Sequence, residues 1–216
     1  MPVSYFDPIP YVFSLIDYYK PKSILDIGIG FGKYGVLCRE ILDVYHGRFN
    51  KEQWSTIIDG IEVFDQYRNS LWDVYSNIYI GDALDILSKN SNQYDLIICS
   101  DVLEHFDKAD GYKLINLCLE RAKVIIINTP RIFLEQGEVF GNIHEAHRSL
   151  WKPKDLKRYN SIVLRTSDTL ITAIMFRDYS FKQRLNVISI INRNNSIGKI
   201  LRLSKDIYYK LHVNKN

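Results

Sequence analysis

The 216-residue sequence predicts a three-layer α/β fold, in which helices cover both faces of a doubly wound, mostly parallel sheet. Short apolar segments alternate with amphipathic helical segments over the first 130 residues. The apolar segments are hydrophobic at nearly every position, which is typical of parallel strands buried on both faces. Two later apolar segments, 161–165 and 170–176, stand four residues apart and predict an antiparallel hairpin that completes the sheet.

The individual elements follow from apolar periodicity and from turn residues. Residues 9–19 carry apolar side chains at helical spacing, and Pro21 ends the pattern. Strands are predicted from continuous apolar runs at 24–27, 56–63, 78–80, 94–99 and 124–127. Further helices are predicted from helical spacing at 33–45, 65–75, 83–87 and 108–120.

The pattern changes after the fifth predicted strand. Residues 131–152 are rich in Gly, His, Arg and aromatic residues without periodicity, which predicts a long ordered loop or lid with a functional role. We therefore expect one domain over 1–180, with its lid at 131–152, and a helical extension over 181–216.

Charge is unevenly distributed. Nine of the 28 Lys and Arg residues, but only two of the 25 acidic residues, lie in 177–216, so the tail is basic and the body mildly acidic. One interpretation is a docked C-terminal helix whose apolar face carries Ile200, Leu203, Ile207 and Leu211. The other is contact of the tail with an anionic membrane surface or a protein partner. The acidic body and the absence of an aromatic-basic stripe disfavour nucleic acid.

Cysteine usage and hydropathy restrict the compartment. Cys38, Cys99 and Cys118 are odd in number, widely spaced and embedded in apolar runs, which disfavours a disulfide framework or a zinc cluster. The first residues lack a basic and then apolar leader, and no apolar run approaches the roughly 20 residues of a membrane span. We expect a cytoplasmic protein.

The stretch at 23–35, S-I-L-D-I-G-I-G-F-G-K-Y-G, combines a strand, a glycine turn and a helix start. This layout brings backbone close to a bound nucleotide at the helix N-terminus. Two cofactors remain open from these residues. A dinucleotide fingerprint G-x-G-x-x-G fits at 30–35, and D-x-G-x-G-x-G fits at 26–32.

Three further motifs follow the next predicted strands: G-I-E-V at 60–63, G-D-A at 81–83 and D-L-I-I-C-S-D-V-L-E-H-F at 95–106. Together with D-x-G-x-G-x-G, this set resembles the class I S-adenosylmethionine-dependent methyltransferases, in the branch with an L-E-H element after strand 4. The resemblance spans about residues 20–130. It implies a Rossmann-like doubly wound sheet and S-adenosylmethionine as the cofactor.

The resemblance also implies roles for the first motif. Gly28 and Gly30 would border the methionine part of the cofactor, and Gly32 completes the glycine turn. Asp26 would orient the ammonium group of the cofactor, directly or through water. A side chain at position 28 or 30 would block this approach of the backbone.

By the same resemblance, Glu62 would accept hydrogen bonds from both ribose hydroxyls. Asp82 would accept one from the adenine amino group, and the backbone of Ala83 would meet the ring. A carboxylate suits a vicinal diol because its two oxygens can accept both hydrogen bonds. Two alternatives stay open: Asp82 as a helix N-cap, and Asp65 in place of Glu62, because the connection before Glu62 is longer than usual.

Asp101 and His105 follow the fourth predicted strand, where the methyl group of the cofactor should emerge. Both are candidate catalytic residues, and Asp101 is also a candidate cofactor ligand. The structural alternatives are a turn cap for Asp101 and a buried packing histidine for His105.

The lid supplies the candidate acceptor contacts. His144 and His147 could serve as proton acceptor and substrate ligand, Arg148 could hold a carboxylate or phosphate, and Trp151 could contact the acceptor. A three-residue gap between histidines also suits a metal on a helix, but no third ligand stands nearby in sequence, so no metal is predicted. The alternative is that these residues only brace the lid.

These observations predict O-methylation of a small molecule, such as a sugar or glycan precursor. Strand 4 ends in S-D-V-L, without the N/D-P-P-Y element by which amino-methylating nucleic-acid enzymes grip a flipped base. The alternative is a non-catalytic binding module that keeps the cofactor fold and acts through the lid and the basic tail. A dinucleotide oxidoreductase is a more distant reading.

Overall fold

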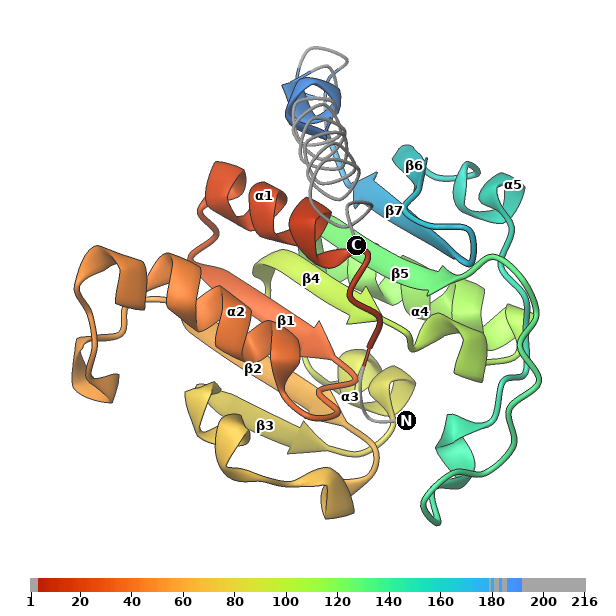
Figure 1. Cartoon of the computed structure of the whole chain (residues 1–216), viewed down its shortest axis with the longest axis horizontal. Helices are drawn as coiled ribbons and strands as arrows, with labels where there is room; N and C mark the ends of the chain where they lie inside the picture. The colour runs from red at the N-terminus through yellow and green to blue at the C-terminus, as the bar shows by residue number, and fades with distance from the viewer. Residues whose placement is uncertain (1–3, 179, 181–182, 184–185, 192–216) are drawn as a thin grey trace, which may run out of the picture. The chain divides into compact units, whose positions relative to one another are not determined.

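The computed structural model describes residues 4–178, 180, 183 and 186–191 (Figure 1). Seven strands form one sheet in the order β3-β2-β1-β4-β5-β7-β6. The strands are β1 Ser23–Ile27, β2 Ile57–Glu62, β3 Asn77–Ile80, β4 Tyr94–Ser100, β5 Ala122–Pro130, β6 Ser161–Arg165 and β7 Leu170–Phe176.

The first five strands pair in parallel, and β7 pairs antiparallel with both β5 and β6. Strands β2 and β3 are added on one side of β1, and β4 and β5 on its other side, so the order in which strands are added reverses at β1. Ligands of such sheets bind beyond the carboxyl ends of the strands at this switch point. The predicted mostly parallel sheet with a C-terminal antiparallel hairpin is confirmed.

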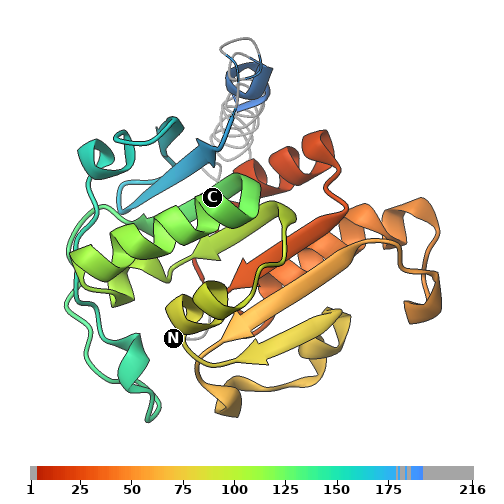
Figure 2. The ribbon, with the colours of Figure 1, turned by 180° about the vertical axis from the view of Figure 1, so that it is seen from behind.

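Helices cover both faces of the sheet. The α-helices are α1 Ile9–Tyr19, α2 Lys33–Leu42, α3 Ala83–Lys89, α4 Lys108–Arg121 and α5 Pro153–Leu156. Helices α1 and α2 lie on the face seen in Figure 1, and α3 and α4 lie on the face seen in Figure 2. The central strands between the two layers are buried almost completely, which explains their continuous apolar sequences.

The helix predicted over 65–75 is wrong. The segment forms two short 3-10 turns, η3 Asp65–Tyr67 and η4 Ser70–Val74. Asn69 separates them in an extended conformation, and its side chain accepts a hydrogen bond from the backbone N–H of Leu71. Such local side-chain bonding competes with helix formation. Trp72 then points inward and donates from Nε1 to the carbonyl of Gly30 at 2.9 Å.

The segment 131–152 is irregular apart from the 3-10 turn η6 Ile143–Glu145. Its end is bound to the segment that follows β4, because the backbone N–H groups of Arg148 and Ser149 both donate to the carbonyl of Glu104. The predicted long ordered loop therefore has fixed contacts beside the strand ends.

The chain divides into two compact units, Met1–Tyr179 and Ser180–Asn216. Residues 186–191 of the second unit are helical. The apolar helical face predicted over 200–211 lies outside the described residues. Among the described helices, none has the length and apolar character needed to cross a membrane.

Candidate functional site

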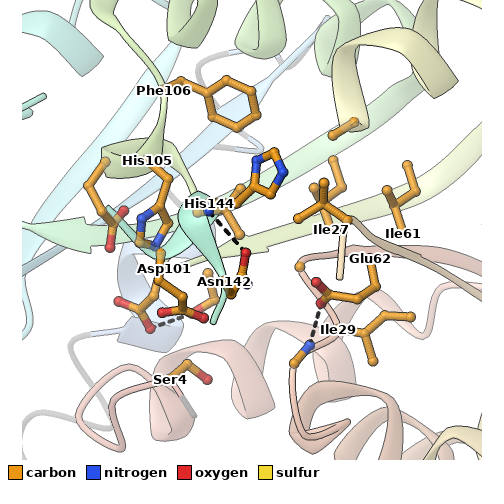
Figure 3. Close-up of a pocket in the computed structure, with 18 of the residues that line it drawn as sticks. Ser4, Ile27, Ile29, Ile61, Glu62, Asp101, His105, Phe106, Asn142 and His144 are labelled. Carbon is orange, nitrogen blue, oxygen red and sulfur yellow. Dashed lines mark hydrogen bonds between the residues drawn. The ribbon is translucent and has the colours of Figure 1, made fainter. Parts of the chain in front are cut away.

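A cavity of about 590 Å³ opens beyond the carboxyl ends of β1, β2 and β4. Its size falls within the roughly 300–1,000 Å³ range of small-molecule sites. One wall comes from the glycine turn after β1, from Glu62 and from the start of α3. The other comes from the segment after β4 and from the lid (Figure 3).

The glycine turn lies against the chain that follows β4. Gly28 has a left-handed φ of 77°, and a Cβ atom added there would stand 2.3 Å from Cγ2 of Val102. Gly30, with φ of 50°, donates its N–H to Oε2 of Glu62 at 2.8 Å. Both glycines line the cavity, so backbone forms this part of the wall.

Gly28→Ala tests this close approach against Gly47→Ala. Both glycines have similar left-handed φ values, 77° and 80°, but a Cβ at Gly47 would meet nothing within 4 Å. The two variants share the backbone penalty, while only Gly28→Ala adds the clash, so we expect it to lose about 1–3 kcal/mol more stability. Urea unfolding measures the difference, and equal losses would contradict the packing described.

Asp26 and Gly32 do not line the cavity, and the predicted contact of Asp26 with the cofactor, directly or through water, stays a prediction. Asp26 is buried, and its Oδ2 accepts a hydrogen bond from the hydroxyl of Tyr75 at 2.5 Å. Tyr75 in turn accepts from the N–H of Gly35. Gly32, with φ of 97°, stands at the N-cap of α2. These residues therefore support the glycine turn from behind.

Burial raises the pKa of Asp26 to about 7, and only one oxygen is bonded within the described structure, while Oδ1 is buried without a partner. The folded state thus holds a proton that the unfolded chain releases near pH 4. The contribution of protonated Asp26 to the free energy of unfolding is fully present below about pH 4, and it is lost as the pH rises toward and through 7.

Asp26→Asn should therefore flatten the pH dependence of unfolding. The amide oxygen of Asn can keep the bond from Tyr75 without titrating. Between pH 5 and 7 we expect the stability of the native chain to fall relative to the variant, by up to about 1.4 kcal/mol per pH unit. Urea unfolding at several pH values measures this, and parallel curves for both proteins would contradict the raised pKa.

Glu62 ends β2 at the cavity and is 5% exposed. Its Oε2 accepts from Gly30 N, and its Oε1 accepts from Phe64 N at 3.0 Å. Burial raises its pKa, and these backbone donors oppose the rise. Each carboxylate oxygen has a second lone pair, so both can still accept from a ligand diol. Asp65, the alternative, is exposed and paired with Arg68 instead.

Asp82 caps helix α3, and it also lines the cavity beside Ala83. Its Oδ1 accepts from the N–H groups of Leu84 at 2.8 Å and Asp85 at 3.3 Å. Both cap bonds use one oxygen, so Oδ2 can accept from a ligand amino group. The N-cap and the ligand role are compatible in one side chain.

The segment after β4 forms the opposite wall. Asp101 has a left-handed φ of 55°, which is uncommon outside glycine and concentrates at functional sites. Its Oδ2 accepts from the N–H of Tyr5 at 3.2 Å, whereas Oδ1 is buried without a partner among the described residues. Burial raises the pKa of Asp101 to about 6.

Glu104 is 3% exposed and also lines this wall. Its Oε2 accepts from the hydroxyl of Thr129 at 3.0 Å. Burial and the nearby Asp101 carboxylate raise the pKa of Glu104 well above its ordinary value. Two buried acids therefore stand at one end of the cavity.

His105 and His147 lie side by side, with ring centroids 5.0 Å apart. Nδ1 of His105 is 3.2 Å from the carbonyl of Ala146, and Nδ1 of His147 is 2.7 Å from the carbonyl of Leu134. Burial lowers the pKa of His105, which favours the neutral imidazole. A backbone carbonyl can only accept a hydrogen bond, so Nδ1 of each ring is the donor in these contacts.

The lid is joined to the opposite wall through Tyr67. The hydroxyl of Tyr67 donates to Oε1 of Glu145 at 2.8 Å, and Nδ2 of Asn142 approaches the same hydroxyl at 3.3 Å. Asn142 also accepts from the N–H of His144, and the imidazole of His144 lies at the cavity in Figure 3. The lid therefore presents His144 to the cavity from a braced turn.

Solved structures resemble the fold of this chain, whereas no protein-family model and no curated protein matches the sequence. An O-methyltransferase family protein from Burkholderia thailandensis aligns with a TM-score of 0.57 and 13% identity, over 80% of this chain and 56% of that one. Magnesium protoporphyrin IX methyltransferase from Synechocystis PCC 6803, with bound S-adenosylhomocysteine, aligns with a TM-score of 0.54 and 15% identity, over 80% and 82%.

The N-terminal domain of EvdMO1, studied with S-adenosylhomocysteine and D-fucose, aligns with a TM-score of 0.54 and 14% identity, over 77% of this chain and 82% of that domain. The chain has the class I methyltransferase fold. The predicted fold is therefore confirmed. The chain spans little more than half of the Burkholderia protein, so the fold is what the two share.

Within this methyltransferase fold, six of the predicted cofactor residues line the cavity: Gly28, Gly30, Glu62, Asp82, Ala83 and Asp101. The predicted catalytic and acceptor residues His105, His144, His147 and Arg148 also line it. The first set and His105 lie at or after strand ends, whereas the path of the lid brings His144, His147 and Arg148 to the same cavity.

Trp151 is not an acceptor contact, which corrects the prediction from the lid sequence. Its side chain is fully buried, and Nε1 donates to the carbonyl of Leu103 at 3.1 Å. The ring packs against α4, where a Cβ added at Gly111 would stand 2.4 Å from it. Aromatic residues in an irregular segment can serve as core anchors as readily as ligand contacts.

One part of the site was missed in the sequence. Residues 4–7 line the cavity, and the carbonyl of Ser4 accepts a hydrogen bond from Lys33. No motif marks this segment. Glu104 was signalled by its place in the L-E-H element, but an acid inside a short apolar run also fits a buried structural role.

Proposed function

We propose that this chain is an S-adenosylmethionine-dependent O-methyltransferase whose acceptor is a small hydroxyl-bearing molecule, such as a sugar or glycan precursor. The observation that carries the proposal is the composition of the single cavity described above. Its two walls combine backbone and acids suited to an adenosyl cofactor with histidines and acids suited to a hydroxyl acceptor.

The wall formed by the glycine turn, Glu62 and the start of α3 would hold the methionine, ribose and adenine parts of the cofactor. Gly28 and Gly30 would border the methionine part, and the two oxygens of Glu62 would accept from the ribose diol. Oδ2 of Asp82 would accept from the adenine amino group while the backbone of Ala83 meets the ring. S-adenosylhomocysteine is bound in the similar magnesium protoporphyrin IX methyltransferase and was present with the EvdMO1 domain, which supports this choice of ligand.

Asp26 would act on the cofactor indirectly. Its bond to Tyr75, which binds the N–H of Gly35, ties the end of β1 to the start of α2. This contact would fix the glycine turn that borders the methionine part. A water-mediated contact to the ammonium group belongs to the same proposal.

Methyl transfer is an in-line displacement. A lone pair of the acceptor oxygen forms the new O–C bond, the C–S bond breaks, and its electrons neutralise the sulfonium to give S-adenosylhomocysteine. The hydroxyl proton would pass to the imidazole of His144, which the lid presents to the cavity. Arg148 would hold an anionic group of the acceptor.

An enzyme accounts for the acceptor wall better than a binding module does. Asp101 keeps an uncommon backbone conformation at this wall, a feature that concentrates at functional sites, and its buried Oδ1 has no partner among the described residues. The similar EvdMO1 domain was crystallised in the presence of D-fucose, and this supports a sugar as the acceptor. A basic tail that contacts a membrane surface or a protein would be an addition to this activity.

The test is turnover with a panel of sugars, nucleotide sugars and hydroxylated small molecules. We expect the chain to convert S-adenosylmethionine into S-adenosylhomocysteine only in the presence of an acceptor, with a methoxy product found by mass spectrometry. If the folded chain binds S-adenosylhomocysteine but no hydroxyl, amine or carboxyl acceptor raises product formation above background, the binding module is favoured.

A further inference from the structure

We infer that Glu104, His105 and His147 form a binding site for a divalent transition-metal ion at the acceptor end of the cavity. The coordinating oxygen and nitrogens of these three residues all lie within 4.8 Å of one another. Ligands of one ion at about 2.0–2.2 Å stand up to roughly 4.4 Å apart, so a small side-chain adjustment suffices.

The two histidines are oriented as metal ligands usually are. Each Nδ1 bonds to a backbone carbonyl, that of Ala146 for His105 and that of Leu134 for His147. Such a second bond fixes the tautomer and the ring orientation, and directs Nε2 toward a metal. Both carbonyls belong to the lid, so the lid itself holds the proposed ligands in place.

The carboxylate of Glu104 is also oriented by a hydrogen bond. It is buried, and the hydroxyl of Thr129 donates to one of its oxygens, which orients the carboxylate. Buried charges are normally paired or coordinate a metal. Among the ion pairs of the described residues, none includes Glu104 or the neighbouring Asp101.

Asp101 adds an independent observation. Its Oδ1 is buried without a hydrogen-bond partner in the described part of the chain, beside the same wall. In Figure 3, Asp101 and His105 lie on one side of the cavity and Glu62 lies on the other. The cluster is therefore separate from the residues assigned to the ribose, and it faces the space left for an acceptor.

Two imidazole nitrogens and one carboxylate oxygen suit Zn²⁺, Mn²⁺, Co²⁺ or Fe²⁺, and they leave coordination positions open toward the cavity. On the proposed function, an acceptor hydroxyl occupies an open position. The ion lowers the pKa of that hydroxyl and fixes its oxygen for attack on the methyl group. The acceptor class is then one with a hydroxyl that can bind a metal, most readily a vicinal diol.

Titration of the full chain with Co²⁺ tests the site, because binding by histidine gives a visible absorption band that needs no turnover. We expect saturation at one ion per chain, and competition by Zn²⁺. Glu104→Gln and His147→Gln should each weaken Co²⁺ binding by about 100-fold or more, since even the loss of an outer partner costs about 10–100-fold.

His46→Ala is the matched control, because His46 is exposed on another turn and should leave Co²⁺ binding unchanged. Binding of S-adenosylhomocysteine is measured in the same preparations, and retained binding shows that a variant is folded. Failure of Co²⁺, Mn²⁺ and Zn²⁺ to saturate a chain that binds S-adenosylhomocysteine would overturn the metal site alone. Metal binding that survives both ligand substitutions would overturn it as well.

Discussion

Glu62→Ala should weaken the binding of S-adenosylhomocysteine by about 100-fold or more. Each hydrogen bond to a charged group contributes about 1.5–3 kcal/mol, and a carboxylate that accepts from both ribose hydroxyls would lose two of them. The N–H groups of Gly30 and Phe64, which now donate to Glu62, would also lose their acceptor. The glycine turn would then be held less firmly against the cavity.

Asp65→Ala is the control for this prediction. Asp65 lies three residues after Glu62, is exposed, and pairs with Arg68 away from the cavity. Isothermal titration with both variants measures the difference, with urea unfolding to establish that each is folded. A folded Glu62→Ala chain with native affinity, or a larger loss in Asp65→Ala, would move the ribose contact away from Glu62.

Trp151→Ala should destabilise the fold by about 3–5 kcal/mol, the usual cost of removing a fully buried aromatic side chain. Trp151 has no exposed surface, bonds to the carbonyl of Leu103 and stacks edge-on with Tyr112 at 5.0 Å between centroids. Lys108 also lies 3.6 Å above its ring. The side chain thus joins the end of the lid to α4 and to the segment after β4.

Phe140→Ala serves as the matched aromatic control, because Phe140 lies in the lid but is 66% exposed. Its loss should change stability by no more than about 0.5 kcal/mol. Urea unfolding of the two variants separates them. If Trp151→Ala kept native stability while acceptor KM rose, the residue would be an acceptor contact after all.

The fold could be predicted from the sequence because each parallel strand is marked by its own continuous apolar run. Residues 94–99 and 124–127 are apolar at nearly every position, and burial on both faces requires this pattern. The helix prediction at 65–75 was wrong because a single residue, Asn69, interrupts the segment. The side chain of Asn69 bonds to its own backbone region and interrupts a spacing that otherwise fits a helix.

The cavity was readable where a motif stands at a strand end. Glu62 ends β2 and Asp82 follows β3, and topology alone brings the ends of neighbouring parallel strands together. Asp26 shows the limit of this reasoning. A residue within a strand can face either layer, and the partner of Asp26, Tyr75, lies on a distant turn that the sequence pattern did not connect to it.

The proposed metal cluster could not be predicted because one of its three ligands, His147, lies 42 residues after the adjacent pair Glu104 and His105. Spacing pairs His147 with His144, but in the structure the ring of His147 lies beside that of His105, and both lid histidines line the cavity. Only the path of the lid across the strand ends decides this pairing. Local spacing is informative on a helix, and residues 144–147 do not form one α-helix.

The central claim is that the cavity beyond β1, β2 and β4 holds the adenosyl cofactor. Isothermal titration of the full chain with S-adenosylhomocysteine tests it without knowledge of the acceptor. We expect one binding event per chain, with a dissociation constant in the range of roughly 1 μM to 1 mM typical of enzyme ligands. Absence of binding at several millimolar S-adenosylhomocysteine, in a chain that unfolds cooperatively, would contradict the account.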